Sequence, residues 1–354
     1  MTNDPASTSA KTHGVLYIGM DLGTSRTSIS ASNGVRETVY SAVGYPKDVV
    51  SRKLLKKEVL FGKEAIEKRL SLKLYKPLEK GVLKFSEQAQ SPEAKENLQA
   101  AKDLIAEAIR MARPRSDELV YCVIGAPAQA SMKNKAAIIE AARATVDSVM
   151  LCSEPFSVAY GLDMLEDCLV VDIGAGTTDM CRMHGTMPED ADQITSEIAG
   201  DAIDHELANL LTKQCKGAQF TIQMVKEIKE RYAYVGEAPE RAVVTLPVEG
   251  KPTQFDVTEL IKKACMILVP PIVEGIRRLI ATFDPEFQHR LRSRVLLAGG
   301  GSMIRGLDTA VEEAMARDLG GGKVVKVDEP VYGGANGALK IAHDMPAEFW
   351  EKLR

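Results

Sequence analysis

Residues 170–179 read Val-Val-Asp-Ile-Gly-Ala-Gly-Thr-Thr-Asp, and this stretch decides the fold prediction for the chain. Its residue types predict a buried strand, a tight glycine turn and the start of a second strand. A near copy occurs early in the chain, where residues 19–25 read Gly-Met-Asp-Leu-Gly-Thr-Ser. Both have the form Asp-x-Gly followed closely by Thr or Ser. Two such turns that face each other can hold a triphosphate between them.

The residue types of both turns suit phosphate binding. Phosphate oxygens need N–H donors at close range, and glycine leaves the backbone bare and permits positive φ. One Asp-x-Gly-Thr is more often an ordinary hairpin turn, but a second copy, also preceded by a hydrophobic run, favours phosphate binding. The residues predicted to contact phosphates are Gly23, Thr24, Ser25, Gly174, Ala175, Gly176, Thr177 and Thr178.

Asp21 and Asp172 begin the two turns, and a carboxylate there repels phosphate unless a cation lies between them. Magnesium suits this place because it binds oxygen ligands, and it loses its water reluctantly. We therefore expect both aspartates to bind Mg²⁺ through water.

Composition narrows the class of protein. With 354 residues, 45% hydrophobic and 27% charged, the chain is globular and long enough for two domains. Its net charge of −4 gives no case for nucleic-acid binding. The six cysteines lack metal-type spacing, so they are expected to be core thiols of a reducing cytosol. Residues 1–13 are polar, and no apolar run reaches the length of a membrane span. We expect a disordered tail, no direct membrane insertion and a cytoplasmic location.

The order of expected elements predicts an internal duplication of an α/β unit. We expect lobe I at 14–160, lobe II at 161–332, and a returning helix of lobe I with the C-terminal tail at 333–354. Accessory subdomains are expected at 47–84 and about 213–258. Ligands in such folds bind at the carboxyl ends of the strands, here in the cleft between the lobes.

Three local expectations concern the elements around the cleft. A third strand is expected over residues 35–43, and one long helix is expected from Thr258 to Ala281. Residues 47–84 hold twelve Lys or Arg against five Asp or Glu, in a chain that is acidic overall. This basic segment fits a solvated face and an interaction surface equally well.

Five motifs occur in the order found in the actin, Hsp70 and sugar-kinase superfamily, which the chain resembles from about residue 15 to 342. The resemblance implies an α/β fold of the duplicated, actin-like ATPase (ribonuclease H-like) type, with two lobes around a nucleotide cleft. It implies ATP or ADP and Mg²⁺ as cofactors, and ATP hydrolysis as the reaction. The motifs are the phosphate turns at 19–25 and 170–179, the connecting helices at 152–161 and 333–342, and the adenosine loop at 296–306.

The resemblance also implies catalytic roles. Glu154 follows a strand and precedes a helix, where the superfamily places the residue that orients the attacking water. Asp172 assists through the metal. Without the other motifs, Glu154 would be a carboxylate that a helix dipole favours. The residues expected beside the adenosine are Gly299, Gly300, Gly301, Ser302 and Met303.

Residues 225–235 look like the helix that flanks the nucleotide in actins. By this likeness Lys229 lies along the purine and Glu230 contacts the ribose, although charges on an exposed helix face are the simpler explanation. Gly200, Asp201 and Lys226 are assigned to the same site. Actins also have a lysine that reaches the phosphates from the strand after the first turn. Here residues 26–28 read Arg-Thr-Ser, and Arg26 stays outside the predicted site.

Four phrases, at 41–49, 153–156, 161–163 and 299–307, are most similar to the bacterial actins of the magnetosome cytoskeleton. This likeness implies that copies of the chain stack head to tail into filaments. ATP would favour assembly, hydrolysis would loosen it, and adaptor proteins would link the filaments to magnetosomes.

Other members of the superfamily supply the alternatives. A filament of the MreB type for cell shape, or of the ParM type for plasmid segregation, would use the same cleft. A small-molecule kinase would need a carboxylate base beside an acceptor pocket, for which no insertion is evident. An Hsp70-type chaperone would need a peptide-binding domain, and a nucleotide sensor would not polymerise.

Overall fold

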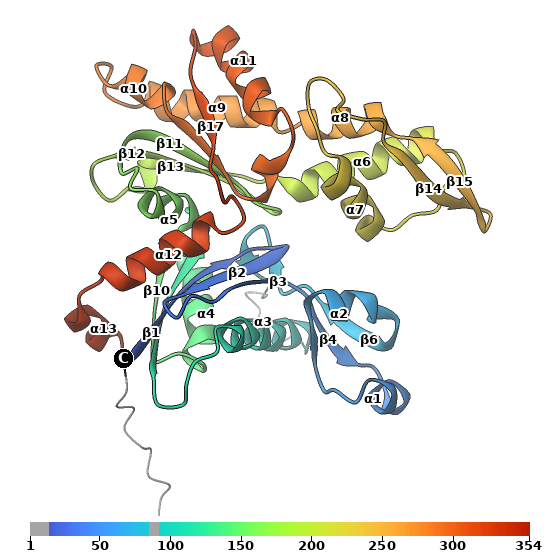
Figure 1. Cartoon of the computed structure of the whole chain (residues 1–354), viewed down its shortest axis with the longest axis horizontal. Coiled ribbons are helices and arrows are strands. Elements are labelled where there is room, and N and C mark those ends of the chain that lie inside the picture. The colour runs from blue at the N-terminus through green and yellow to red at the C-terminus, as the bar shows by residue number, and fades with distance from the viewer. Residues whose placement is uncertain (1–13, 85–91) are drawn as a thin grey trace, which may run out of the picture.

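The computed structural model describes residues 14–84 and 92–354, so the tail expected at 1–13 lies outside the described residues. Two lobes stand one above the other, each around a five-stranded sheet (Figure 1). The two small subdomains lie on the same side of the molecule, at the right of Figure 1.

Lobe I is built on β1 (Val15–Leu22), β2 (Arg26–Ala31), β3 (Arg36–Tyr40), β9 (Leu119–Ala126) and β10 (Ser148–Ser153). The sheet order is β3-β2-β1-β9-β10. The first three strands form an antiparallel meander, and β9 and β10 continue it in parallel with β1.

Lobe II repeats this arrangement with β11 (Glu166–Ile173), β12 (Thr178–His184), β13 (Gln193–Ser196), β16 (Val295–Ala298) and β17 (Val324–Lys326). The order is β13-β12-β11-β16-β17, again an antiparallel meander followed by two parallel strands. The predicted duplication of an α/β unit is therefore confirmed.

Helices cover both sheets. Lobe I carries α3 (Pro92–Met111), α4 (Met132–Arg143), α5 (Glu154–Gly161), α12 (Gly333–Asp344) and α13 (Ala347–Leu353). Lobe II carries α6 (Gly200–Gln214), α7 (Ile222–Tyr232), α8 (Thr258–Met266), α9 (Val269–Ala281), α10 (Gln288–Arg292) and α11 (Leu307–Leu319).

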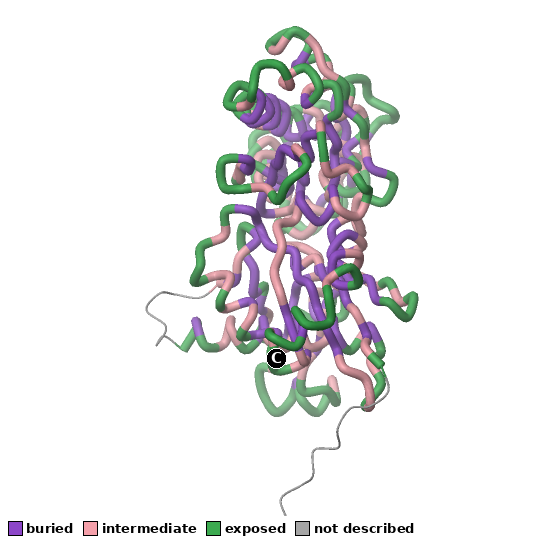
Figure 2. The backbone as a smooth tube through the Cα atoms, turned by 90° about the vertical axis from the view of Figure 1, so that its left-hand side faces the viewer, coloured by how far each residue is buried: buried purple, intermediate pink, exposed green. Residues whose placement is uncertain are grey.

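Buried side chains form one core in each lobe and a third core between the lobes. In Figure 2 buried segments run through the interior of both halves of the molecule, and most exposed segments lie at the periphery. All six cysteines are free, and five are buried, as expected for core thiols. Among residues 14–84 and 92–354, no helix is both long and apolar enough to cross a membrane.

The lobes are joined through α5 and α12, which lie against each other between the two sheets (Figure 1). Glycine permits this close approach. A Cβ built on Gly337 would lie 1.7 Å from the carbonyl oxygen of Ser157, and one built on Gly19 would lie 2.1 Å from that of Ala335. No side chain fits at either position without separating the backbones, so these glycines set the spacing at the hinge.

The accessory subdomain of lobe I contains β4 (Val43–Pro46), α1 (Val49–Leu55), β5 (Leu60–Phe61), α2 (Gly62–Glu67), a 3-10 helix (Arg69–Ser71), β6 (Leu72–Tyr75), β7 (Leu78–Glu79) and β8 (Val82–Leu83). Its three-stranded sheet has the order β5-β4-β6. The accessory hairpin of lobe II consists of β14 (Val243–Val248) and β15 (Lys251–Asp256).

Two element predictions were wrong. The strand expected over 35–43 is divided between β3 and β4, because the backbone and hydroxyl of Ser41 bond to the first phosphate turn and draw the chain out of the sheet. The helix expected from Thr258 to Ala281 is two helices, and α8 ends before Pro270 and Pro271 in the first turn of α9. Proline lacks an N–H and clashes with the preceding turn, so it suits a helix start and not its interior.

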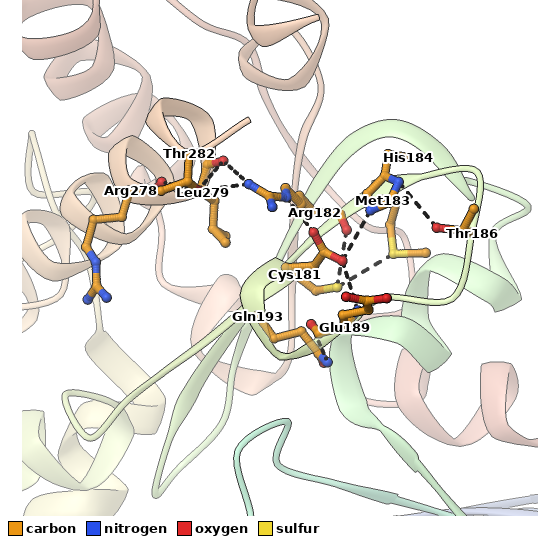
Figure 3. A network of polar contacts seen from close by, with 11 residues as sticks. Cys181, Arg182, Met183, His184, Thr186, Glu189, Gln193, Arg278, Leu279 and Thr282 are labelled. Atoms are coloured by element: carbon orange, nitrogen blue, oxygen red, sulfur yellow. Dashed lines mark hydrogen bonds and ion pairs between the residues drawn. The ribbon is translucent and has the colours of Figure 1, made fainter. Parts of the chain in front are cut away.

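A buried polar network stabilises lobe II between β12 and the end of α9 (Figure 3). Arg182 on β12 forms an ion pair with Asp192 at 2.6 Å, and only 8% and 6% of the two side chains are exposed. The guanidinium also donates to the Leu279 carbonyl at 2.8 Å and to the Thr282 hydroxyl at 2.9 Å. The network therefore joins β12 to the end of α9.

Candidate nucleotide-binding cleft

The two phosphate turns lie at the carboxyl ends of β1 and β11 and meet between the lobes. A Cβ built on Gly176 would lie 2.5 Å from Thr24 Oγ1. The turn between β7 and β8 touches both, because the Gly81 N–H donates to Thr24 Oγ1 at 2.7 Å and a Cβ built on Gly176 would lie 2.7 Å from Lys80 Cα. The two motifs that decided the fold prediction thus form one site.

Both turns close with the same hydrogen bond. The N–H of Gly23 donates to the carbonyl of Arg26 at 3.1 Å, and the N–H of Gly174 donates to that of Thr177 at 2.9 Å. Glycine permits positive φ, but neither these two glycines nor Gly176 has it. Close approach explains them better, because a Cβ on Gly23 would lie 2.6 Å from the Arg26 carbonyl oxygen.

The hydroxyls of the second turn are bonded within lobe II. Thr178 is 1% exposed, and its hydroxyl donates to the Ile198 carbonyl at 2.9 Å. The hydroxyl of Thr177 lies near Asp179 and counters part of the rise in the pKa of that carboxyl. The N–H groups of Gly200 and Asp201, at the start of α6, donate to the Gly174 and Ala175 carbonyls at 3.1 and 2.7 Å. The start of α6 therefore fixes the shape of this turn.

Four carboxylates gather behind the turns: Asp21, Glu154, Asp172 and Asp179. Burial raises the pKa of Asp21 to about 6. Burial and the neighbouring Asp21 raise the pKa of Glu154 and of Asp172 well above their usual values, and Asp179 adds to both. Asp172 and Asp179 also lie directly opposite each other on β11 and β12. Like charges in such a pair are destabilising, so the cluster favours a function over a structural role.

The carboxylates fit a magnesium ion bound through water. In the described part of the chain, no three His, Cys, Asp or Glu side chains are close enough to hold a metal directly. Asp179 Oδ2 is buried, and it has no hydrogen-bond partner among the described residues. A hydrated cation would supply donors and positive charge to such groups. Sequence reasoning missed Asp179, although its signal was present: it is the acid that closes the decisive stretch.

The helix α7 presents three charged residues to the cleft. The Lys226 ammonium donates to the Ser25 hydroxyl, and burial lowers the pKa of Lys226. Lys229 is turned toward α6, where it donates to the Gly200 carbonyl and pairs with Asp204, both at 2.8 Å. Glu230 pairs with Arg26 of lobe I at 3.2 Å. Arg26 is therefore a cleft residue that sequence reasoning left out.

The adenosine loop follows β16. Gly299 has φ +74°, and its Cβ would lie 2.3 Å from Asp172 Oδ1, so it packs on the second turn. Ser302 is buried and donates to the Gly299 carbonyl at 2.8 Å. Gly300 faces open space, and 58% of Met303 is exposed. Gly300 and Met303 are thus the accessible members of the predicted set, while Gly301 packs against the strand that precedes the second turn.

A cavity of about 140 Å³ opens beside the first turn, and residues of both lobes line it, including Thr24, Ser25, Tyr40, Asp201 and Lys226. A larger groove of about 830 Å³ lies on the outside of lobe I between β3, α2 and α3, with no phosphate-turn residue in its lining. The smaller cavity, not the larger groove, belongs to the candidate site.

Two lobes of one topology, hinged by paired helices and with facing Asp-x-Gly turns, define the actin-like class of nucleotide-binding folds. The chain belongs to the MreB/Mbl protein family, whose family model matches residues 16–348.

Characterised relatives extend this assignment. The chain is 39% identical over 338 residues to the actin-like protein MamK of Paramagnetospirillum magneticum, covering 96% of this chain and 95% of the relative. It is also 39% identical to MamK of Magnetospirillum gryphiswaldense, covering 96% of this chain and 92% of that relative. It is 28% identical to the cell shape-determining protein Mbl of Bacillus cereus, but over only 52% of this chain and 58% of that protein.

Two solved structures differ in how well they match. The subunit of a MamK double helical filament superposes with a TM-score of 0.89 at 39% identity, covering 94% of this chain and all of that one. A non-polymerising MamK mutant bound to AMPPNP gives 0.69 at 38% identity, covering 94% and 99%. This structure therefore superposes more closely on the filament subunit than on the mutant bound to AMPPNP.

Proposed function

We propose that this protein is a bacterial actin that binds and hydrolyses ATP with Mg²⁺ and assembles into dynamic filaments that organise and position magnetosomes. The observation that carries the proposal is the pair of phosphate turns facing each other over four clustered carboxylates, of which Asp172 and Asp179 are buried. The likeness over nearly the full chain to MamK, whose filaments and AMPPNP complex have been solved, supports it. A cytoplasmic location and adaptor proteins on the magnetosome are parts of the same proposal.

In the proposed mechanism, the phosphates bind along the backbone of the two turns at 23–25 and 174–178 and to the hydroxyls of Thr24 and Ser25, which line the cavity, and 299–303 faces the adenosine. Asp21 and Asp172 would hold a hydrated Mg²⁺, which supplies positive charge to the phosphates and the carboxylates. Glu154 begins α5 beside Gly125, where a Cβ would lie 3.3 Å from Glu154 Cγ. From this fixed position its carboxylate orients a water toward the terminal phosphate.

Assembly is proposed to use the exposed apolar face of α1 in the basic subdomain. Val49, Val50 and Leu54 are 81%, 75% and 69% exposed, whereas the single buried residue of this helix is Ser51. The flanking side chains Arg52, Lys53 and Lys56 are exposed too. A helix that turns its aliphatic residues to the surface is typical of a protein contact, and a contact between unlike surfaces of identical subunits builds a filament.

The test is sedimentation and phosphate release with and without Mg-ATP, for wild type and for Glu154→Ala. We expect the wild type to sediment only with nucleotide and to release phosphate. The variant should sediment while its phosphate release falls by roughly 10²-fold or more. Protein that stays in the supernatant throughout and turns over only with a hydroxylated acceptor would instead identify a small-molecule kinase.

The cellular role has its own test. The chain, expressed in a magnetotactic bacterium that lacks its own MamK, should restore the placement of the magnetosome chain, and Glu154→Ala should form static filaments. Filaments that leave magnetosomes unaligned but change cell shape or plasmid inheritance would favour an MreB-type or a ParM-type role.

A further inference from the structure

Two neighbouring residues of lobe I bind one face of a helix of lobe II. Ser25 accepts a hydrogen bond from Lys226, and Arg26 Nη2 lies 3.2 Å from Glu230 Oε1. Lys226 and Glu230 are one turn apart on α7, so they project side by side. The two lobes are thus bonded directly across the cleft, at the end of the first phosphate turn.

Tyr40 completes this arrangement. Arg26 Nη2 donates to the Tyr40 hydroxyl at 3.1 Å, and its guanidinium carbon lies 4.7 Å from the ring centre. The Lys226 ammonium lies 5.9 Å from the same ring. A cation over an aromatic face is attracted to it. The Tyr40 ring therefore attracts Arg26 of lobe I and Lys226 of lobe II. We call Ser25, Arg26, Tyr40, Lys226 and Glu230 the cleft clasp.

Three residues of the clasp lie at the candidate site. The cavity of about 140 Å³ beside the first turn is lined by Ser25, Tyr40 and Lys226, all of them clasp residues, and by Thr24 of the phosphate turn. The clasp is also weak, because the side chains of Arg26 and Glu230 remain 38% and 35% exposed. A pair of this exposure changes an equilibrium constant by roughly two- to fivefold. A contact this weak breaks readily, so it can control the rate at which the cleft opens.

We propose that the cleft clasp controls nucleotide release, and that Arg26 is a positioning residue that acts through Glu230 rather than a ligand of the phosphates. The inference rests on the proposed function, since it requires a nucleotide in the cleft. Its basis is the direction of the Arg26 side chain, which follows the first turn as the phosphate-binding lysine of actins does but which bonds to Tyr40 and Glu230.

The experiment measures release of 1,N6-etheno-ATP chased by excess ATP with Mg²⁺, at a protein concentration where nothing sediments. Arg26→Lys, Arg26→Gln and Arg26→Glu are compared in the wild-type and Glu230→Gln backgrounds. We expect Arg26→Lys to release close to the wild-type rate, Arg26→Gln roughly two- to fivefold faster, and Arg26→Glu faster again through repulsion. With Glu230→Gln these differences should shrink to less than about twofold, because the partner is gone.

Arg110→Glu is the matched control, since Arg110 pairs with Glu107 inside the single helix α3 at 2.6 Å and does not bridge the lobes. Equal release rates for all Arg26 variants would overturn the clasp, as would unchanged differences in the Glu230→Gln background. Loss of binding in Arg26→Lys, with unfolding temperature unchanged, would make Arg26 a nucleotide ligand and also overturn it. A wild type that binds no nucleotide would overturn both the clasp and the proposed function, so the two failures are distinguishable.

Discussion

At the scale of single residues, Asp21 shows that the candidate site lowers the stability of the folded protein. Its pKa is about 6 in the folded protein against an ordinary 3.8, so the folded state binds the proton more tightly than the unfolded state. The free energy of unfolding should therefore fall as pH rises from about 4 to 6. Asp21→Asn should weaken this dependence and, without nucleotide, stabilise the protein at pH 7 by up to about 3 kcal/mol.

Denaturant titrations of the two proteins between pH 4 and 8 measure this effect. The same variant should bind Mg-ATP more weakly, because Asp21 is a proposed magnesium residue. A variant less stable than wild type at pH 7, with an unchanged pH profile, would show that the Asp21 carboxylate is not under electrostatic stress.

Arg182 provides the opposite case, a buried charge that is fully paired. Arg182→Met leaves Asp192 buried without its partner at 2.6 Å, so we expect a loss of about 3–5 kcal/mol in the free energy of unfolding. Arg277→Met, which removes an exposed pair with Glu274 on α9, should change it by less than about 0.5 kcal/mol. Similar losses in both variants would contradict a special role for burial.

Residue-scale prediction from sequence succeeded where the chemistry is local. The two Asp-x-Gly turns could be predicted because their residue types, at short spacing, match phosphate and cation binding. Arg26 and Glu230 are far apart in the chain, and no local pattern indicates that they meet. The packing role of Gly176 was equally hidden, since it depends on the approach of Thr24 from the other lobe.

At the scale of elements, the hinge makes a sharp prediction about one helix. Gly337→Ala in α12 puts a methyl group 1.7 Å from the Ser157 carbonyl oxygen, so α5 and α12 must separate. We expect a loss of at least about 3 kcal/mol in the free energy of unfolding. Gly333→Ala in the same helix meets Val158 at an ordinary 3.6 Å and should be neutral or stabilising by about 0.5–1 kcal/mol. Equal denaturation midpoints for the two variants would contradict this.

The exposed face of α1 makes the second element prediction. Val50→Asp and Leu54→Asp alter side chains that are 75% and 69% exposed, so folding stability should change by less than about 0.5 kcal/mol. If α1 is a filament contact, sedimentation with Mg-ATP should require roughly tenfold more protein. Met132→Asp, at a 79% exposed site at the start of α4, is the control. Normal sedimentation of both α1 variants would exclude this face from the filament.

Element types and the duplication were predictable because strands and helices differ in hydrophobic period. The residues at which these elements begin and end were harder to predict. The helix expected through 258–281 kept its period across the two prolines, and only backbone chemistry divides it there. The bend at Ser41 depends on the first phosphate turn, which lies outside any local window.

At the scale of the whole molecule, the structure superposes more closely on a filament subunit than on a relative that does not polymerise. The TM-score is 0.89 to the MamK filament and 0.69 to the non-polymerising mutant bound to AMPPNP, at nearly equal identity. If assembly stabilises the filament arrangement, a subunit unable to assemble should turn its lobes away from it. Leu54→Asp is the suitable protein, because it leaves the cleft and the hinge unchanged.

Small-angle scattering of Leu54→Asp with AMPPNP and Mg²⁺ tests this expectation. The scattering curve should fit the lobes as arranged in the non-polymerising relative better than the arrangement described for this chain. Arg26→Glu added to Leu54→Asp should move the curve further from the filament arrangement, because the cleft clasp no longer joins the lobes. If the filament arrangement fits the curves of both Leu54→Asp and the double variant with Arg26→Glu, the lobes are rigid before assembly. Filament formation would then select subunits already in the right shape, and nucleotide would act at the contacts between subunits rather than through lobe rotation.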